Sequence, residues 1–260
     1  MLNPTLDPSL FPAVVAHRGA SSDHPENTLP SFQAAIEAGA QFVEADVRLT
    51  ADGVPVILHD AEVSRTTDGT GFVHEMTYEE VRRLDASMGR GPRTEIPSLS
   101  DLLELAHGRA GVNLEIKNLP GYPGFDPADG VVDATLRDLE RTGFEGPVLI
   151  CSFNPGSVAR SRISAPGTPT GLLAVEEVDP RDALGLARDG GHAFVGPAVG
   201  AVLRVGEAFV GEAHAAGVRV ATWTVDDEET LRTLFRWGVD AVASNDPVLA
   251  LRIRAEHLAC

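Results

Sequence analysis

Carboxylates alternate with apolar residues in the segment QFVEADVRL, residues 41–49. Successive side chains of a strand point to opposite faces, so Glu44 and Asp46 share one face and the small apolar residues between them share the other. In a closed barrel the apolar face meets the surrounding helices, which turns Glu44 and Asp46 inward. Neighbouring buried carboxylates repel each other and resist desolvation unless a cation lies between them. For this segment alone, a solvated edge strand is the alternative interpretation.

The segment NLEIKN, residues 113–118, repeats this alternation. Its leucine and isoleucine face one way, and Glu115 and Lys117 face the other. The pattern thus predicts a third inward carboxylate and an inward ammonium, although both charges can also pair with charges on adjacent strands. Three carboxylates without thiolate ligands suit a hard cation, Mg²⁺ or Ca²⁺, better than zinc.

Two histidines, His17 and His59, each end a strand-like run, and each is followed by a charged residue, Arg18 or Asp60. A lone histidine is usually a packed core residue, but the carboxyl ends of barrel strands converge on the active site. Such convergence would join two imidazoles and three carboxylates to Arg18 and Lys117. This set suits a phosphodiester, because the cationic groups neutralise its charge and the imidazoles can exchange protons near neutral pH.

Strand-like runs alternate with helical patterns along the chain. The run at 54–59 follows the second strand too closely for a helix to intervene, and we count it as an adjunct of that strand. About eight units then remain, which predicts a (β/α)₈ TIM barrel. A doubly wound sheet is the alternative, but no glycine-rich dinucleotide fingerprint follows the first strand. The predicted strands are 13–17, 41–49, 112–117, 146–152, 169–174, 193–196, 218–225 and 241–244.

The predicted helices are 27–40, with Asn27 as N-cap, and those near 128–142, 155–163, 179–188, 206–216, 227–237 and 247–256. Residues 61 to about 105 break the rhythm with a long, glycine-rich and only partly helical stretch. We interpret this stretch as an insertion after the second strand unit, because long loops in compact domains usually serve function or are disordered. The length suits one barrel domain over residues 1–260.

The net charge of −17 disfavours nucleic acid and anionic membranes as partners but permits a small anionic substrate in a locally positive cleft. The only cysteines, Cys151 and Cys260, indicate no disulfide framework. The first residues contain neither a basic segment nor a long apolar run, so we expect no signal peptide or membrane span and a cytoplasmic location. The sequence does not indicate an oligomeric state.

These residues stand in motifs that closely resemble those of the glycerophosphodiester phosphodiesterases. The resemblance spans nearly the whole chain in the order of that family. It implies a TIM barrel with a family-specific insertion, and metal-dependent hydrolysis of a glycerophosphodiester to an alcohol and sn-glycerol 3-phosphate. The matching motifs are AHRGASSDHPENTLPSFQAAIEAGAQFVEADVRLTADGVPVILHD (16–60), TTDGTG (66–71), IPSL (96–99), LEIK (114–117), SFNP (152–155), TWTVD (222–226) and GVDAVASNDP (238–247).

The resemblance also implies roles for individual residues. Glu44, Asp46 and Glu115 match the metal ligands of the family, with Mg²⁺ or Ca²⁺ as the cofactor. His17 and His59 match its acid–base histidines, although their separate roles stay open. The first nucleophile is water or the glycerol 2-hydroxyl, and attack by the hydroxyl would pass through a cyclic phosphate.

The same resemblance assigns Arg18 and Lys117 to the substrate phosphate. Trp223 is placed on the glycerol side of the pocket, with an inward-facing core aromatic as the alternative. Two positions depart from the family pattern, Ser244 and Asp226, and we expect neither to contact the reacting atoms.

Three alternatives accompany this hypothesis. A lysophospholipase D-like enzyme would need an apolar or basic membrane-facing surface near the barrel mouth. A metal-dependent aldolase or lyase barrel has less need of two histidines together with an arginine and a lysine. A barrel that binds a ligand without catalysis has little reason to keep both acid–base groups beside a carboxylate cage.

Overall fold

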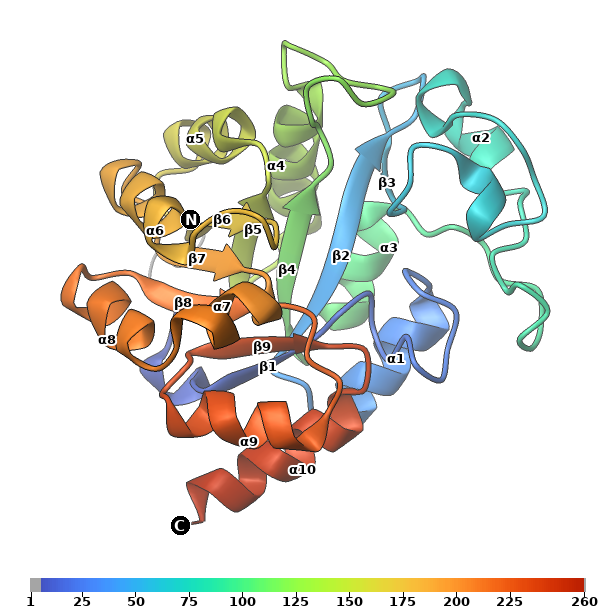
Figure 1. Cartoon of the computed structure of the whole chain (residues 1–260). Helices are drawn as coiled ribbons and strands as arrows, with labels where there is room; N and C mark the ends of the chain where they lie inside the picture. Colours follow the sequence, from blue (N-terminus) through green and yellow to red (C-terminus); the bar gives the residue numbers. More distant parts are fainter. Residues whose placement is uncertain (1–5, 260) are drawn as a thin grey trace.

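The computed structural model describes residues 6–259, so Cys260 lies outside the described part of the chain. Eight parallel strands form a closed barrel, because β1 pairs with β2 on one side and with β9 on the other. The predicted (β/α)₈ TIM barrel is therefore confirmed (Figure 1). Its strands are β1 (Ala13–Ala16), β2 (Phe42–Leu49), β4 (Gly111–Ile116), β5 (Val148–Ser152), β6 (Thr170–Ala174), β7 (Phe194–Pro197), β8 (Arg219–Thr222) and β9 (Ala241–Ser244).

The adjunct of the second strand is also confirmed. Strand β3 (Pro55–Ile57) runs antiparallel to the end of β2, with Val47 opposite Ile57. This short strand begins opposite Leu49, at the carboxyl end of β2, and returns the chain toward Asp46, which brings His59 to the wall of the barrel cavity.

Helices cover the outside of the barrel. Those that match the predicted segments are α1 (Leu29–Ala38), α4 (Gly130–Thr142), α5 (Pro155–Ser164), α6 (Pro180–Asp189), α8 (Ala208–Ala215), α9 (Glu228–Arg236) and α10 (Pro247–Leu258). The short helix α7 (Val199–Val205) was not predicted, because its run of valines has no polar face to mark a helical period.

The N-cap prediction for α1 was wrong by one residue. Thr28 is the cap, because its side chain accepts a hydrogen bond from the Ser31 N–H. Asn27 instead takes a left-handed backbone conformation with φ of 57° and donates its side-chain N–H to Asp46 Oδ2 at 2.7 Å. A residue that resembles a cap in the sequence thus lies in the candidate site.

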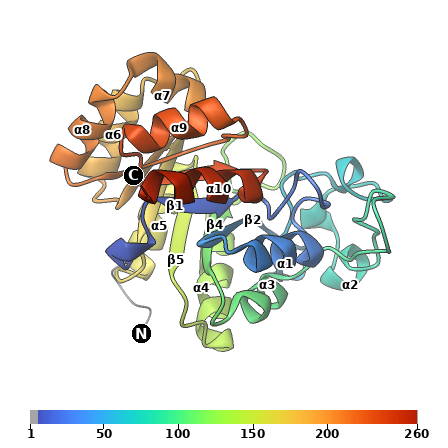
Figure 2. The same ribbon diagram turned by 90° about the horizontal axis from the view of Figure 1, so that it is seen from below.

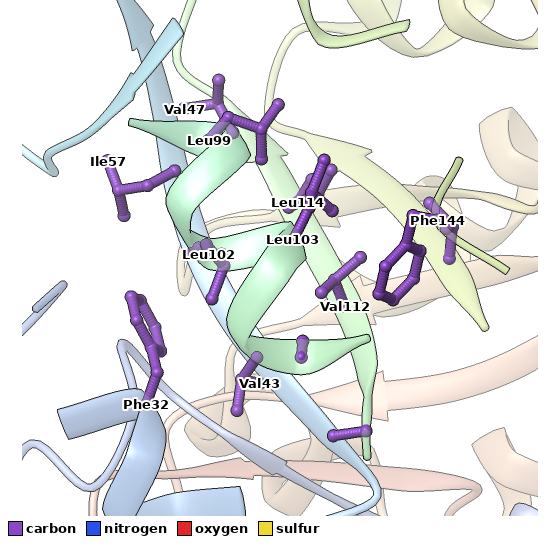
Figure 3. Close-up of a cluster of buried hydrophobic side chains, with 14 of the residues drawn as sticks. Phe32, Val43, Val47, Ile57, Leu99, Leu102, Leu103, Val112, Leu114 and Phe144 are labelled. Atoms are coloured by element: carbon purple, nitrogen blue, oxygen red, sulfur yellow. The ribbon is translucent and has the colours of Figure 1, made fainter. Parts of the chain in front are cut away.

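Helix α3 (Leu99–Ala106) seals the barrel beside β2 and β4. Its Leu102 and Leu103 pack among Val43, Val112 and Leu114, the outward-facing residues of those strands (Figure 3). Because these valines and leucines fill the space between strand and helix, the charged residues that alternate with them must face the barrel interior.

The segment between β3 and α3 projects from the side of the barrel (Figures 1 and 2). It contains two 3₁₀ helices, η2 (Val63–Arg65) and η3 (Val73–Glu75), and the short helix α2 (Tyr78–Val81). Its small core joins Val63, Val73, Val81 and Ile96 to Val56 of β3. The stretch predicted as an insertion, residues 61 to about 105, ends with α3, which packs on the barrel.

The amino-terminal segment covers the opposite end of the barrel. It includes the 3₁₀ helix η1 (Pro8–Leu10), and Leu6 and Phe11 pack with Phe42 and Phe194, which begin β2 and β7. In the described part of the chain, no helix is both long and apolar enough to cross a bilayer.

Candidate active site

Three carboxylates meet inside the barrel. Asp46 lies directly opposite Glu115 in the register of β2 and β4, and Glu44 lies one inward position before Asp46. One oxygen from each of the three residues lies within 4.8 Å of the others, and all three residues are buried. The inward orientation that the alternating pattern predicted is therefore present, and the edge-strand alternative is excluded.

Two cationic side chains contact this cluster. Lys117 Nζ lies 3.0 Å from Asp46 Oδ1 and 2.5 Å from Glu115 Oε1. Arg18 Nε lies 3.3 Å from Asp46 Oδ2, and the Arg18 backbone N–H donates to Glu44 Oε2 at 2.8 Å. The cluster thus joins three acidic groups to two basic ones, which leaves one formal negative charge when all five groups are ionised.

Lys117 is the only lysine among the 21 lysines and arginines of the sequence. An ammonium is a compact point charge on a flexible stem, whereas a guanidinium is a planar fork. The position between Asp46 and Glu115 suits the compact ammonium. The use of a lysine here, in a chain that otherwise uses arginine, therefore marks this buried position in the sequence.

The environment splits the pKa values of the three carboxyl groups. Burial raises the pKa of Glu44 well above its usual range, and the charges of Asp46 and Glu115 raise it further. Burial also raises the pKa of Glu115. Burial acts in the same direction on Asp46, but Lys117 and Arg18 outweigh it and lower the pKa of that carboxyl. Without a further cation, Glu44 is thus the carboxyl group that holds a proton most readily.

The carboxylate cluster fits a divalent cation. Glu44 Oε1 is buried and has no partner among the described residues, whereas Asp46 Oδ1 and Glu115 Oε1 are paired only with Lys117 Nζ. Buried acceptors rarely lack such partners, and carboxylate oxygens are the ligands that Mg²⁺ and Ca²⁺ prefer. These three oxygen atoms therefore form a candidate metal centre.

His17 follows β1 and is held by a neutral amide. Its Nδ1 lies 2.8 Å from Asn245 Oδ1, and Asn245 Nδ2 donates to Asp226 Oδ2 at 2.7 Å. Because Asp226 fixes the amide with its oxygen toward the imidazole, His17 Nδ1 must carry the hydrogen and Nε2 is left as the acceptor. Burial and the Arg18 charge lower the pKa of His17, which favours this neutral form.

His59 follows β3 and is held by a carboxylate. Its Nδ1 lies 2.6 Å from Asp60 Oδ1, and Asp60 is paired with Arg65 of η2. Arg65 also binds Glu26, which in turn binds Arg18. Burial lowers the pKa of His59, whereas the charge of Asp46 and the hydrogen bond to Asp60 oppose this effect.

Seven of the eight predicted site residues line one cavity of about 210 Å³. Trp223 forms part of its wall, where its Nε1–H donates to the Gly196 carbonyl at 2.8 Å and its ring meets Phe153 edge to face. Asp46 does not line the cavity, because Lys117, Arg18 and Asn27 surround it. The predicted residues in its lining are His17, Arg18, Glu44, His59, Glu115, Lys117 and Trp223.

Sequence reasoning missed the residues that hold the two imidazoles. Asp226 and Ser244 were set aside as minor departures, yet Asp226 accepts hydrogen bonds from Ser244 Oγ at 3.1 Å and from Asn245. The signal was available, because Asn245 directly follows β9, the neighbour of β1, just as His17 directly follows β1. Glu26 and Arg65 gave no such signal, since neither follows a barrel strand.

The arrangement is suited to a phosphodiester. Arg18 and Lys117 supply positive charge at the cavity wall, the carboxylate cluster can hold a hard cation, and two differently supported imidazoles face the same space. Charge neutralisation and proton transfer are the two requirements of phosphodiester hydrolysis.

Comparison with known proteins agrees with this chemistry. The model of the glycerophosphoryl diester phosphodiesterase family matches residues 17–249. The chain is 35% identical over 241 residues to a glycerophosphodiester phosphodiesterase of Caldanaerobacter subterraneus subsp. tengcongensis, with 90% of this chain and 94% of that protein covered. It is 32% identical to a glycerophosphodiester phosphodiesterase of Bacillus altitudinis, with 94% and 98% covered.

A solved structure is similar throughout. An Oleispira antarctica phosphodiesterase, determined in complex with the product sn-glycerol-3-phosphate, superposes with a TM-score of 0.85 at 30% identity. The match covers 95% of this chain and 98% of that one.

Proposed function

Because the chain belongs to the glycerophosphoryl diester phosphodiesterase family, an enzyme family of phosphoric diester hydrolases, we propose that it hydrolyses glycerophosphodiesters to an alcohol and sn-glycerol 3-phosphate. We further propose that it requires a divalent cation, Mg²⁺ or Ca²⁺. The observation that carries the proposal is the set of three buried carboxylates, with one oxygen of each lying within 4.8 Å of the others, next to two imidazoles in one cavity. The glycerol 3-phosphate bound to the Oleispira relative supports this substrate class.

Glu44, Asp46 and Glu115 would hold the cation. When bound there, it would supply Lewis-acid charge that neutralises phosphoryl oxygens and lowers the pKa of a coordinated hydroxyl or water. Arg18 and Lys117 add fixed positive charge at the same wall of the cavity, and their pairing with Asp46 holds both side chains in place before substrate arrives.

The two imidazoles would divide the proton transfers. His17 Nε2 carries no proton, since Nδ1 donates to Asn245, so His17 accepts the proton of the nucleophile. The Asp60 carboxylate stabilises a protonated His59, which donates its proton to the oxygen of the departing alcohol as the P–O bond breaks.

The nucleophile is water or the glycerol 2-hydroxyl of the substrate. Attack by the hydroxyl closes a cyclic phosphate and releases the alcohol, and water then opens that ring with the two imidazoles in exchanged roles. Trp223 lies on the wall beside Phe153, and we place the glycerol carbons against it.

We also propose that residues 1–260 act as one domain with the insertion at about 61–105. The partner is a small glycerophosphodiester rather than nucleic acid. The net charge of −17 disfavours stable association with anionic membranes and is compatible with a cytoplasmic location.

The test is hydrolysis of glycerophosphocholine and glycerophosphoethanolamine, with glycerol 3-phosphate as the detected product. Release of glycerol 3-phosphate from both substrates supports the proposal. Release of choline from lysophosphatidylcholine without turnover of the two water-soluble diesters would instead identify a lysophospholipase D-like enzyme. Carbon–carbon cleavage in the absence of phosphodiester hydrolysis would identify a lyase.

A further inference from the structure

A second pocket, of about 130 Å³, lies at the rim of the barrel next to the catalytic cavity. Three separate segments form it: the end of β2 with Arg48, the 3₁₀ helix η3 with His74, and the loop between β4 and α4 from Asn118 to Asp126. Lys117 lines both this pocket and the catalytic cavity, so the two are neighbours.

Two groups in this pocket have unused hydrogen-bonding capacity. Arg48 donates Nε–H and Nη2–H to the His59 carbonyl at 2.9 and 2.7 Å, and its Nη1 has no partner among the described residues. His74 Nδ1 is buried and likewise has no partner there. A buried polar atom without a partner is costly in a folded protein, so His74 Nδ1 is a candidate hydrogen-bonding group for a ligand.

The loop is shaped to keep His74 in this place. Gly124 has a φ of 80°, and a Cβ at that position would lie only 2.9 Å from His74 Nδ1. Only glycine lets the loop lie against the imidazole in this conformation. The loop with Gly124 and the 3₁₀ helix with His74 thus pack closely against each other at this pocket.

The free groups favour an oxyanion. The one carboxylate in the lining, Asp126, is already engaged, since its two oxygens accept the backbone N–H groups of Ala128 and Gly130 at 2.8 Å. The Arg48 guanidinium is always charged and matches the geometry of a carboxylate or phosphate. An imidazole N–H at His74 can add a second donor.

We propose that this pocket binds an oxyanion carried by the alcohol part of the substrate. The inference rests on the proposed phosphodiesterase function. Arg48 of this pocket binds the carbonyl of His59, the residue proposed to protonate the departing alcohol, and Lys117 lines both cavities, so the second pocket is next to the proposed leaving-group side. The substrates selected are glycerophosphodiesters whose alcohol bears a carboxylate, such as a serine head group.

Glycerophosphoserine and glycerophosphoethanolamine form a matched pair for the test, because they differ only by a carboxylate. We measure kcat/KM for both substrates and take the serine-to-ethanolamine ratio in the wild type, R48Q and H74L. Loss of one charge-assisted hydrogen bond lowers this ratio by about tenfold in R48Q, and loss of the neutral donor lowers it by a few-fold in H74L. A ratio is used because Arg48 also holds His59, so R48Q lowers activity on both substrates.

The control variant is R181Q, which removes an arginine that pairs with Glu212 on the surface helices α6 and α8 and should leave the ratio unchanged. H74L does not disturb the His59 carbonyl and gives an independent readout if R48Q folds poorly. A ratio that stays within twofold of wild type in both variants, with glycerophosphoethanolamine still hydrolysed, overturns the subsite and leaves the phosphodiesterase intact. No turnover of either diester by the wild type overturns both proposals.

Discussion

The two histidines of the site are of the same type and both follow strands, but they are supported in different ways. His17 is fixed by Asn245 and Asp226, which follow the barrel strands β9 and β8. His59 is fixed by Asp60, the next residue in the chain, which is in turn paired with Arg65 of the inserted segment. The His17 support is an oriented amide, whereas the His59 support is a carboxylate within a chain of ion pairs.

Burial lowers the pKa of both imidazoles, but only His59 has a hydrogen-bonded carboxylate that opposes this effect. An amide oxygen holds one tautomer of a neutral imidazole, but a carboxylate also stabilises the imidazolium. The two histidines also differ in the part of the fold that positions them. Loops that follow barrel strands hold His17, whereas the inserted segment helps to hold His59. The comparison leads to predictions of decreasing size.

Removal of either imidazole should have the largest effect on turnover. H17A and H59A should each lower kcat by roughly 10²–10⁴-fold, the contribution typical of general acid–base catalysis. Cation affinity, measured by calorimetry, should stay near that of the wild type because neither histidine belongs to the carboxylate cluster. Retained turnover in one variant would remove that histidine from the mechanism.

Substitution of Lys117 tests whether the buried carboxylates need its positive charge. K117M leaves Asp46 and Glu115 buried without their ammonium partner, which should cost about 3–5 kcal/mol of unfolding free energy in the absence of a divalent cation. Urea unfolding measures this change, and added Mg²⁺ or Ca²⁺ should restore more stability to the variant than to the wild type. An equal gain in both proteins would show that the ammonium and the cation do not neutralise the same charges.

Substitution of the residues that hold the imidazoles, Asn245 and Asp60, should distinguish the roles of the two histidines. N245A should lower kcat about tenfold with little change in KM, because the His17 tautomer is no longer fixed. D60A should instead lower the pKa of His59 further and move the alkaline limb of the kcat profile to lower pH, since the carboxylate that stabilises its protonated form is lost. Identical pH profiles for the two variants would contradict the assignment of different roles.

The smallest predicted effect concerns pH and the cation. Burial raises the pKa of Glu44, so the cation-free cluster retains a proton below that pKa and must release it when a cation binds. Affinity for Mg²⁺ or Ca²⁺ should therefore rise with pH until Glu44 is ionised in the free protein. Calorimetry in buffers of different ionisation enthalpy counts the released proton, and the E44Q variant should release fewer protons.

The sequence predicted the barrel and the residues that face its interior, because both depend on local periodicity. Alternation over 41–49 and 113–118 determines which side chains share a face, and the short spacing before 54–59 excludes a helix there. The family resemblance added the roles of these residues. The order of the strands along the chain then brought together His17 and Glu115, which are far apart in sequence.

The supporting network could not be predicted in the same way. Arg65 meets Glu26 only because the inserted segment folds back toward the loop after β1, and no periodicity describes that path. Asn27 was read as a helix cap because asparagine favours both caps and left-handed turns, and the structure uses the turn. The second pocket likewise depends on Gly124 and His74, which lie 50 residues apart in two loops.

The central claim is that the carboxylate cluster holds a cation required for phosphodiester hydrolysis. The most direct measurement is glycerol 3-phosphate release from glycerophosphocholine by protein treated with EDTA, before and after addition of Mg²⁺ or Ca²⁺, in the wild type and E44Q. We predict loss of activity with EDTA, recovery with one of the two cations, and little recovery in E44Q at the same cation concentration. Full activity of the wild type in EDTA would contradict the account.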